Sequence, residues 1–386
     1  MKEQVINPDL EFVKEVIDAG GETLKKCFQC ATCSVVCNVT PDDKPFPRKE
    51  MLQAQWGLKD ELFANPDIWL CHQCSDCTAH CPRGAKPGEV LGAVRKLSLQ
   101  EYSSPSFLGK MVADPKFLIA LVAVPLAIFL GILAKLGHLN MANIKPGHDG
   151  GIVYANFIPV PYIDVVFILA ASFAGFTFLR GVLKYWERLK SGAQKQPDGD
   201  LSINLAVALK EILFHERFDK CTVTEARKTS HMFVLFSFIG LAITTTWAIA
   251  YLYGNEFLGI QPMYGLHFGE SPYPLTDPMK ILGNLSAIAL LVGITLVILN
   301  RMNNAEKAGM GSYYDWLFIG VVSAIVVTGV MSEVLRLSNI AALAYPTYLI
   351  HLSSVFFLFA YAPFSKMAHM VYRTTAMVFA KMADRK

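Results

Sequence analysis

Six long apolar stretches set the main limit on what this chain can fold into. They lie at residues 117–137, 158–182, 231–254, 279–300, 313–335 and 343–366. Each approaches or exceeds the roughly 17 to 25 residues that a helix needs to cross the hydrocarbon core of a bilayer. We therefore predict six transmembrane helices within residues 106–386.

The composition agrees with a membrane protein. Of the 386 residues, 53% are hydrophobic and 17% are charged, and the mean hydropathy is +0.36. These values are too apolar for an ordinary soluble protein of this length. The net charge of +3 is too small to suggest a nucleic-acid partner. The polar start "MKEQVINPDLEFVKEVIDAG" lacks the apolar core of a signal peptide, so we expect an N-terminus that stays in the cytoplasm.

Basic residues are unevenly distributed among the segments that join the six stretches. Lys and Arg gather before the first stretch, after the second, after the fourth and at the C-terminus, whereas residues 255–278 contain neither. Loops rich in Lys and Arg lie on the cytoplasmic side of a membrane. We therefore predict a multi-pass protein of the cytoplasmic (inner) membrane, with both termini and the region before the first stretch in the cytoplasm.

Residues 1–105 are polar and show helical periodicity, and they contain eight of the nine cysteines. These cysteines form two runs with the same C-x2-C-x2-C-x3-C spacing. The runs are Cys27, Cys30, Cys33 and Cys37, and Cys71, Cys74, Cys77 and Cys81. Disulfides are disfavoured in a cytoplasmic domain. Zinc, the other alternative, is usually bound by two cysteines from each of two hairpins.

The spacing instead favours iron–sulfur clusters. In bacterial ferredoxins, three cysteines of such a run bind one 4Fe-4S cluster and the fourth binds the other cluster. The runs therefore predict a ferredoxin-like α-helical domain with two 4Fe-4S clusters. One would be bound by Cys27, Cys30, Cys33 and Cys81, and the other by Cys71, Cys74, Cys77 and Cys37. We expect His72, His80 and the ninth cysteine, Cys221, not to bind iron.

Histidines at membrane depth indicate a second redox cofactor. A haem b between helices needs two facing imidazoles, and a histidine inside a membrane is otherwise costly. His351 and His369 are eighteen residues apart, which is five turns of one helix and about 27 Å along its axis. One ring should therefore lie near each membrane surface. His231, at the cytoplasmic start of the third stretch, is the expected partner of His369.

The partner of His351 is left open by the sequence. The other apolar stretches hold no histidine at its depth, and the nearest candidates are His267 and His138, in or beside the outer loops. We expect His215 to lie on the solvated face of an amphipathic helix rather than to bind iron. The sequence thus predicts a cytochrome b bundle with one or two haems b.

These motifs resemble a known family. The cysteine domain is similar to the C-type iron–sulfur polypeptide of heterodisulfide reductases, and the membrane part is similar to their E-type cytochrome b and to the gamma polypeptide of nitrate reductases. The fusion resembles the membrane component of the quinone-interacting membrane-bound oxidoreductases of sulfate-reducing bacteria. His351 and His369 match the paired histidines in the last helix of the gamma polypeptide, and His231 matches an earlier one. Leu241 stands where that polypeptide has a further histidine.

The resemblance implies a subunit of a quinone-dependent oxidoreductase complex. It implies electron transfer between menaquinol and flavin-containing, heterodisulfide-reductase-A-like partner subunits in the cytoplasm, with adenylylsulfate reductase as the downstream acceptor in sulfate respiration. A quinol also releases two protons, so ionisable residues near the outer face are candidates for its site: Asp164, Asp277, Glu333 and Arg336.

Three alternatives to this function remain. The first is the membrane component of a related heterodisulfide reductase-like or sulfite-pathway complex. The second is a haem-free membrane anchor for a ferredoxin domain. The third is a redox-driven transporter, which would need charged residues at mid-membrane, where the six stretches have almost none.

Overall fold

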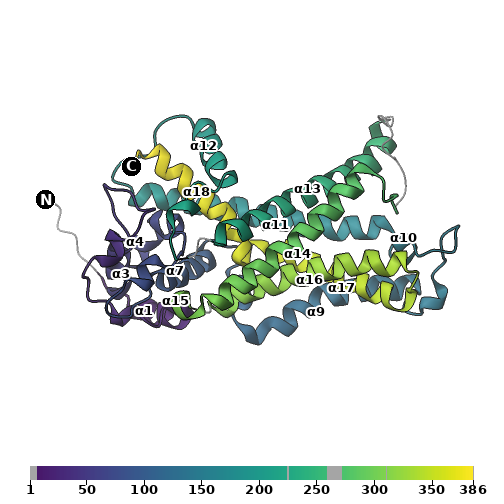
Figure 1. Ribbon diagram of the computed structural model, residues 1–386, viewed down its shortest axis with the longest axis horizontal. Helices are drawn as coiled ribbons and strands as arrows, with labels where there is room; N and C mark the ends of the chain where they lie inside the picture. Colours follow the sequence, from purple (N-terminus) through teal and green to yellow (C-terminus); the bar gives the residue numbers. More distant parts are fainter. Residues whose placement is uncertain (1–6, 224–225, 259–271, 310, 386) are drawn as a thin grey trace.

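The computed structural model describes residues 7–223, 226–258, 272–309 and 311–385. Over these ranges the chain forms helices and loops and no strand, which confirms the predicted all-α fold. A compact N-terminal region lies at one end of the molecule, and a bundle of long helices extends away from it (Figure 1).

The N-terminal region is built from short helices that pack around one longer helix. Its helices are α1 (Leu10–Val16), α2 (Thr32–Val35), α3 (Arg48–Gln55), α4 (Lys59–Phe63), α5 (Asp67–Leu70), α6 (Asp76–Ala79) and α7 (Pro87–Tyr102). Val90 and Val94, one turn apart on α7, are fully buried with Phe12 of α1 and Met51 of α3. Burying such a side chain stabilises the fold by about 1.5–3 kcal/mol.

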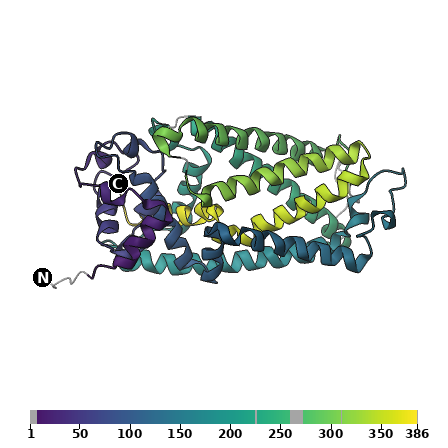
Figure 2. The ribbon, with the colours of Figure 1, turned by 90° about the horizontal axis from the view of Figure 1, so that it is seen from below.

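Within the described residues, six helices are long and apolar enough to cross a membrane. They are α9 (Leu118–Leu136), α11 (Val160–Gly192), α13 (Ala226–Leu258), α14 (Pro278–Asn303), α16 (Tyr313–Leu337) and α17 (Ala341–Tyr361). Their order in the bundle follows the chain, since α13 packs on α14, α14 on α16 and α16 on α17, which also contacts α9 and α11. The view from below shows them side by side along the long axis (Figure 2).

Close approach within the bundle depends on small residues. At Gly293 of α14, a Cβ atom would lie 2.8 Å from the Cβ of Phe233 and 3.0 Å from the backbone nitrogen of Val234, both on α13. Such a contact is too short for any larger residue, as is common where membrane helices pack. At Gly320 of α16, by contrast, an added Cβ would meet no atom within 4 Å.

Five shorter helices complete the described fold. They are α8 (Ser106–Ala113), α10 (Tyr154–Phe157), α12 (Leu201–Leu213), α15 (Ala305–Ala308) and α18 (His369–Met382). Helix α8 leads from the N-terminal region into the bundle. Helix α18 returns the chain to the N-terminal region, where it packs on α5, α11 and α12.

The prediction that His351 and His369 lie on one continuous helix is wrong. Helix α17 ends at Tyr361, a short 3-10 turn covers Ala362–Phe364, and Ser365 is extended before α18 begins at His369. Pro363 explains the break, because proline has no N–H for an intrahelical hydrogen bond and its ring clashes with the preceding turn. The two histidines are therefore placed by two different helices.

Helix α11 is much longer than a bilayer requires, and its last turns join the core of the N-terminal region. Tyr185 and Leu189 of α11 are buried in the same cluster as Trp69 and Tyr102. Tyr372 of α18 completes this contact by stacking on Trp69, with ring centroids 5.2 Å apart. One apolar core therefore continues across the boundary predicted near residue 105, and the region before that residue is packed against the bundle rather than merely tethered to it.

A buried carboxyl group lies near this contact. Glu50 of α3 has a fully buried side chain, which accepts a 2.8 Å hydrogen bond from the Asn65 amide. Burial, together with the nearby Asp67 carboxylate, raises the pKa of Glu50 to about 7 from its ordinary value of 4.5. The ammonium group of Lys49, 3.8 Å away, opposes this shift only partly. Asp67 itself is ion-paired with Arg385.

We therefore expect the stability of the protein to depend on pH through Glu50. The folded state keeps a proton that the unfolded chain releases, so this contribution is full below about pH 4.5 and is lost as the pH rises through 7. The shift corresponds to on the order of 3 kcal/mol. Glu50→Gln should raise the thermal unfolding midpoint of the purified protein at pH 8.5 and have little effect at pH 5. Glu15→Gln, on the exposed side of α1, is the control. Equal effects of Glu50→Gln at both pH values would contradict this account.

Candidate iron–sulfur and histidine site

The two cysteine runs share an unusual backbone conformation. In the first run, Gln29 and Ala31 have positive φ values of 61° and 70°, and in the second run Gln73 and Ser75 have values of 53° and 71°. Non-glycine residues rarely adopt this conformation, and they do so mostly at functional sites. In each run the two residues lie two and four positions after the first cysteine, so both loops curl in the same way.

The structure brings the eight cysteines together in two sets of four. One pocket is lined by Cys27, Cys30, Cys33 and Cys81. A second pocket is lined by Cys37, Cys71, Cys74 and Cys77. Each set thus takes its fourth cysteine from the other run, as in the pairing predicted from the sequence. Four cysteine sulfurs around a small space are the donor set of a 4Fe-4S cluster, so the residues present fit two such clusters.

The two sets differ in their surroundings, and we name them accordingly. The distal set, Cys27, Cys30, Cys33 and Cys81, lies near the surface, with Cys30 exposed. The proximal set, Cys37, Cys71, Cys74 and Cys77, has two buried members, Cys71 and Cys77. Burial raises the pKa of the Cys33 thiol to about 11 and that of Cys37 to about 12. Because iron binds thiolates, cluster insertion must release these protons.

Three histidines come together where the bundle meets the N-terminal region. The rings of His231 on α13 and His369 on α18 have centroids 6.5 Å apart. His369 Nδ1 lies 2.6 Å from the carbonyl oxygen of Lys366, and His231 Nδ1 lies 2.7 Å from Nε2 of His215. In both rings the hydrogen bond engages Nδ1 and leaves Nε2 available to a metal.

The prediction that His215 lies on a solvated helix face is wrong. Helix α12 ends at Leu213, and His215 follows with a positive φ of 54° that turns its side chain inward. The residue is only 2% exposed. Its ring orients His231 instead of facing solvent. Periodicity could not reveal this, because the helical pattern stops just before His215.

Aromatic rings connect the histidines to the proximal set. The ring of Phe218 lies 5.2 Å from that of His231 and 5.0 Å from that of His72, measured between centroids. His72 directly follows Cys71 in the chain. The side chain of His72 is buried, as expected for a residue that supports the cysteines, whereas His80 is exposed. The proximal set and the His231–His369 pair are therefore neighbours.

The ninth cysteine also lies at the proximal set. The sulfur of Cys221 and a carboxylate oxygen of Asp76 lie within 4.8 Å of the Cys74 sulfur. Asp76 accepts hydrogen bonds from the backbone nitrogens of Thr222 and Val223, at 3.1 and 2.9 Å. This carboxylate holds the segment before α13 against the second cysteine run. The sequence offered no signal for the contact beyond the presence of the cysteine.

His351 lies apart from the other histidines, within the bundle. Its Nδ1 atom is 3.1 Å from the carbonyl oxygen of Ile325 and 3.1 Å from the Thr328 hydroxyl, both on α16. A Cβ at Gly329 would come within 3.0 Å of the His351 ring, so glycine gives this ring its room. His267, one suggested partner, lies outside the described residues. His138, the other, has its Nδ1 atom 2.7 Å from the carbonyl oxygen of Phe157.

The four ionisable residues suggested for a quinone site have separate surroundings. Asp164 accepts a hydrogen bond from Tyr253. Glu333 accepts from Lys280 at 2.8 Å and from Asn284 at 3.1 Å. Asp277 caps the start of α14, and Arg336 lies in the last turn of α16. Capping alone accounts for Asp277, whereas Glu333 and Lys280 form a partly buried ion pair between α14 and α16.

Comparison with known proteins defines the class of the N-terminal region. Residues 23–85 match the family described as "4Fe-4S dicluster domain", so this region is a domain for two 4Fe-4S clusters. It is 36% identical over 105 residues to the C-type polypeptide of the H(2):CoB-CoM heterodisulfide,ferredoxin reductase of Methanothermobacter marburgensis. That alignment covers 26% of this chain and 53% of the relative, so the chain spans about half the length of this relative.

The membrane part has more distant relatives. It is 26% identical over 196 residues to the E-type polypeptide of the dihydromethanophenazine:CoB--CoM heterodisulfide reductase of Methanosarcina thermophila, covering 49% of this chain and 70% of the relative. Citrate utilization protein B of Escherichia coli is 23% identical over 372 residues, covering 92% of this chain and 89% of the relative. No solved structure matches the chain. The chain therefore combines a dicluster domain with a multi-pass membrane part, which suggests electron transfer.

Proposed function

We propose that this chain is the membrane electron-transfer subunit of a menaquinol-dependent oxidoreductase complex. The observation that carries the proposal is the adjacency of the His231–His369 pair to the proximal cysteine set through Phe218 and His72. When bound, a haem b and two 4Fe-4S clusters each accept and release single electrons. The chain's own residues would hold these groups in sequence between the membrane and the surface.

The histidine pair has the spacing that a haem iron needs. Two imidazoles bound to opposite sides of one metal, through metal–nitrogen bonds of about 2 Å, have ring centroids on the order of 6 Å apart. The observed 6.5 Å between His231 and His369 fits this arrangement. The carbonyl of Lys366 and the ring of His215 fix the orientation of the two imidazoles. His351 is the proposed ligand of a second haem, with His267 as its suggested partner.

The resemblance and the relatives support the assignment of partners. We propose a QmoC-like role, in which electrons pass from menaquinol to flavin-containing, heterodisulfide-reductase-A-like subunits and onward to adenylylsulfate reductase. The dicluster domain would face the cytoplasm of a cell whose inner membrane holds the bundle, because the basic segments lie on that side. Asp164, Glu333 and Arg336 are proposed to serve proton release at the opposite side.

The test is a spectroscopic measurement on the purified full-length protein. We expect a reduced-minus-oxidised spectrum of haem b, a pyridine haemochrome content of one or two haems per chain, and reduction of both clusters on addition of menadiol. Absence of haem in a protein that retains iron and sulfide would leave only an anchored ferredoxin domain. Haem without cluster reduction by menadiol would exclude the quinol as donor.

A second candidate is an electron-transfer subunit for a different soluble oxidoreductase. It is favoured by the alignment to citrate utilization protein B over nearly the whole chain. The membrane chemistry would be the same, and only the soluble partner would differ. Co-purification of the native complex, followed by identification of the bound soluble subunits, separates the two candidates.

A further inference from the structure

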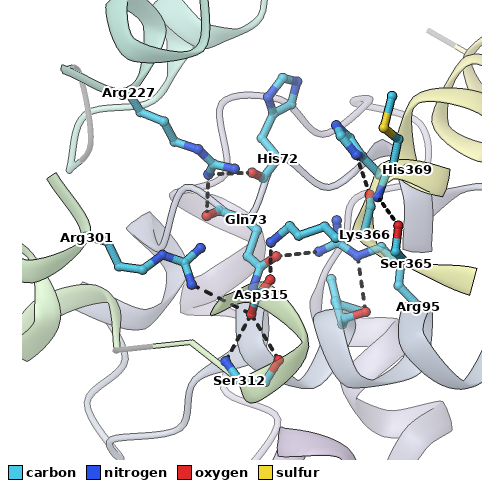
Figure 3. Close-up of polar contacts among 12 residues, drawn as sticks. His72, Gln73, Arg95, Arg227, Arg301, Ser312, Asp315, Ser365, Lys366 and His369 are labelled. Atoms are coloured by element: carbon cyan, nitrogen blue, oxygen red, sulfur yellow. Dashed lines mark hydrogen bonds and ion pairs between the residues drawn. The ribbon is translucent and has the colours of Figure 1, made fainter. Parts of the chain in front are cut away.

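Three arginines from separate helices converge on the first residues of the second cysteine run (Figure 3). Arg95 of α7 donates to the carbonyl oxygen of Cys71 at 3.2 Å. Arg227 of α13 donates to the carbonyl oxygens of His72 and Gln73, at 2.9 and 2.8 Å. Arg373 of α18 donates to the Cys71 carbonyl oxygen at 3.3 Å and also contacts the His72 ring. The backbone that carries Cys71 is thus held from three sides.

Two of these arginines lie on the helices that carry the paired histidines. Arg227 precedes His231 by four residues on α13, and Arg373 follows His369 by four residues on α18. Residues four apart lie on the same face of a helix, about one turn from each other. Each helix therefore directs a histidine to the shared pair and an arginine to the cysteine loop.

The three arginines bring positive charge to this loop without acidic partners of their own. Across the part of the chain that the structure describes, the ion pairs between basic and acidic side chains include none made by Arg95, Arg227 or Arg373. A guanidinium group stays protonated in proteins. Positive charge therefore accumulates beside the proximal set. At the distal set, Arg83 is exposed and stacks on Phe28 instead, with its guanidinium 4.2 Å from the ring centroid.

We propose that Arg227 and Arg373 are positioning residues that couple the histidine pair to the proximal set. They hold the Cys71–Gln73 backbone against the two histidine helices, and their charge favours the reduced, more negative form of a cluster bound there. The reduction potential of the proximal cluster would then lie above its value without these charges. The inference rests on the proposed function, since it needs the proximal set to hold a cluster that exchanges electrons with the membrane part.

The test compares reduction potentials in the full-length protein by redox titration followed by electron paramagnetic resonance. Arg373→Gln should shift the potential of the proximal cluster downward and leave the distal cluster unchanged. We expect at least a tenfold change in the ratio of oxidised to reduced proximal cluster at a fixed potential, which is about 59 mV for one electron. Arg188→Gln is the matched control, because Arg188 pairs with Asp60 and Glu101 and does not contact the cysteine loop.

Charge and geometry are separated by a conservative variant. Arg373→Lys keeps the positive charge and should keep most of the potential, and Arg227→Gln should repeat the downward shift from the other helix. If Arg373→Gln loses the proximal cluster, the Arg227→Gln titration decides. Unchanged potentials in Arg227→Gln and Arg373→Gln, or equal shifts of both clusters, would overturn the proposal. A wild-type protein without haem or clusters would instead refute the proposed function.

Discussion

Replacing His369 with alanine should remove one haem b per chain while leaving both iron–sulfur clusters in place. His369 and His231 face each other with ring centroids 6.5 Å apart, and each ring has Nε2 available for iron. Loss of one axial ligand leaves a single imidazole to hold the haem. The pyridine haemochrome content should fall from two to one if His351 holds a second haem, and from one to none if it does not.

Two further variants make this result specific. His138→Ala removes a histidine that instead contacts the Phe157 carbonyl at 2.7 Å, and it should leave the haem content unchanged. His215→Ala removes only the group that orients His231, and loss of such an outer partner typically costs about 10- to 100-fold in affinity for the metal group. We expect this variant to bind haem more weakly than wild type. Wild-type haem content in His369→Ala would show that the pair does not hold a haem.

The parts of this protein that sequence could predict are those set by local rules. Six helices follow from the length of six apolar stretches, because a bilayer requires about 20 apolar residues whatever the tertiary fold. The two cysteine sets follow from spacing, because three sulfurs within seven residues can only meet around a common centre. Leucine and valine patterns, by contrast, did not show that α11 continues into the core beside Trp69.

The parts that sequence could not predict depend on the ends of helices and on contacts between them. Pro363 was compatible with a kink or a stop, and only packing decided that the helix ends at Tyr361. His215 lies just beyond the last periodic position of α12, where the amphipathic pattern carries no information. The contacts from Arg227 and Arg373 to residues 71–73 span more than 150 positions along the chain. No periodicity connects residues so far apart.

Removing single cysteines should show which cluster each of them holds. If the sets are those gathered in the structure, Cys81→Ala should lose the distal cluster and Cys37→Ala the proximal one. Either change should lower the iron content from about eight to about four atoms per chain. If each run instead held its own cluster, the two variants would exchange their effects. Cys221→Ala, which removes a cysteine outside both sets, should retain both clusters.

Electron delivery from the membrane distinguishes the two losses. The proximal set adjoins the histidine pair and the distal set includes the exposed Cys30, so electrons from the membrane should reach the distal cluster through the proximal one. In Cys81→Ala, menadiol should still reduce the remaining cluster. In Cys37→Ala, the remaining cluster should be reduced by dithionite but only slowly by menadiol. The opposite pattern would mean that the sequence-adjacent cysteines bind together, and that Cys37 belongs with Cys27, Cys30 and Cys33.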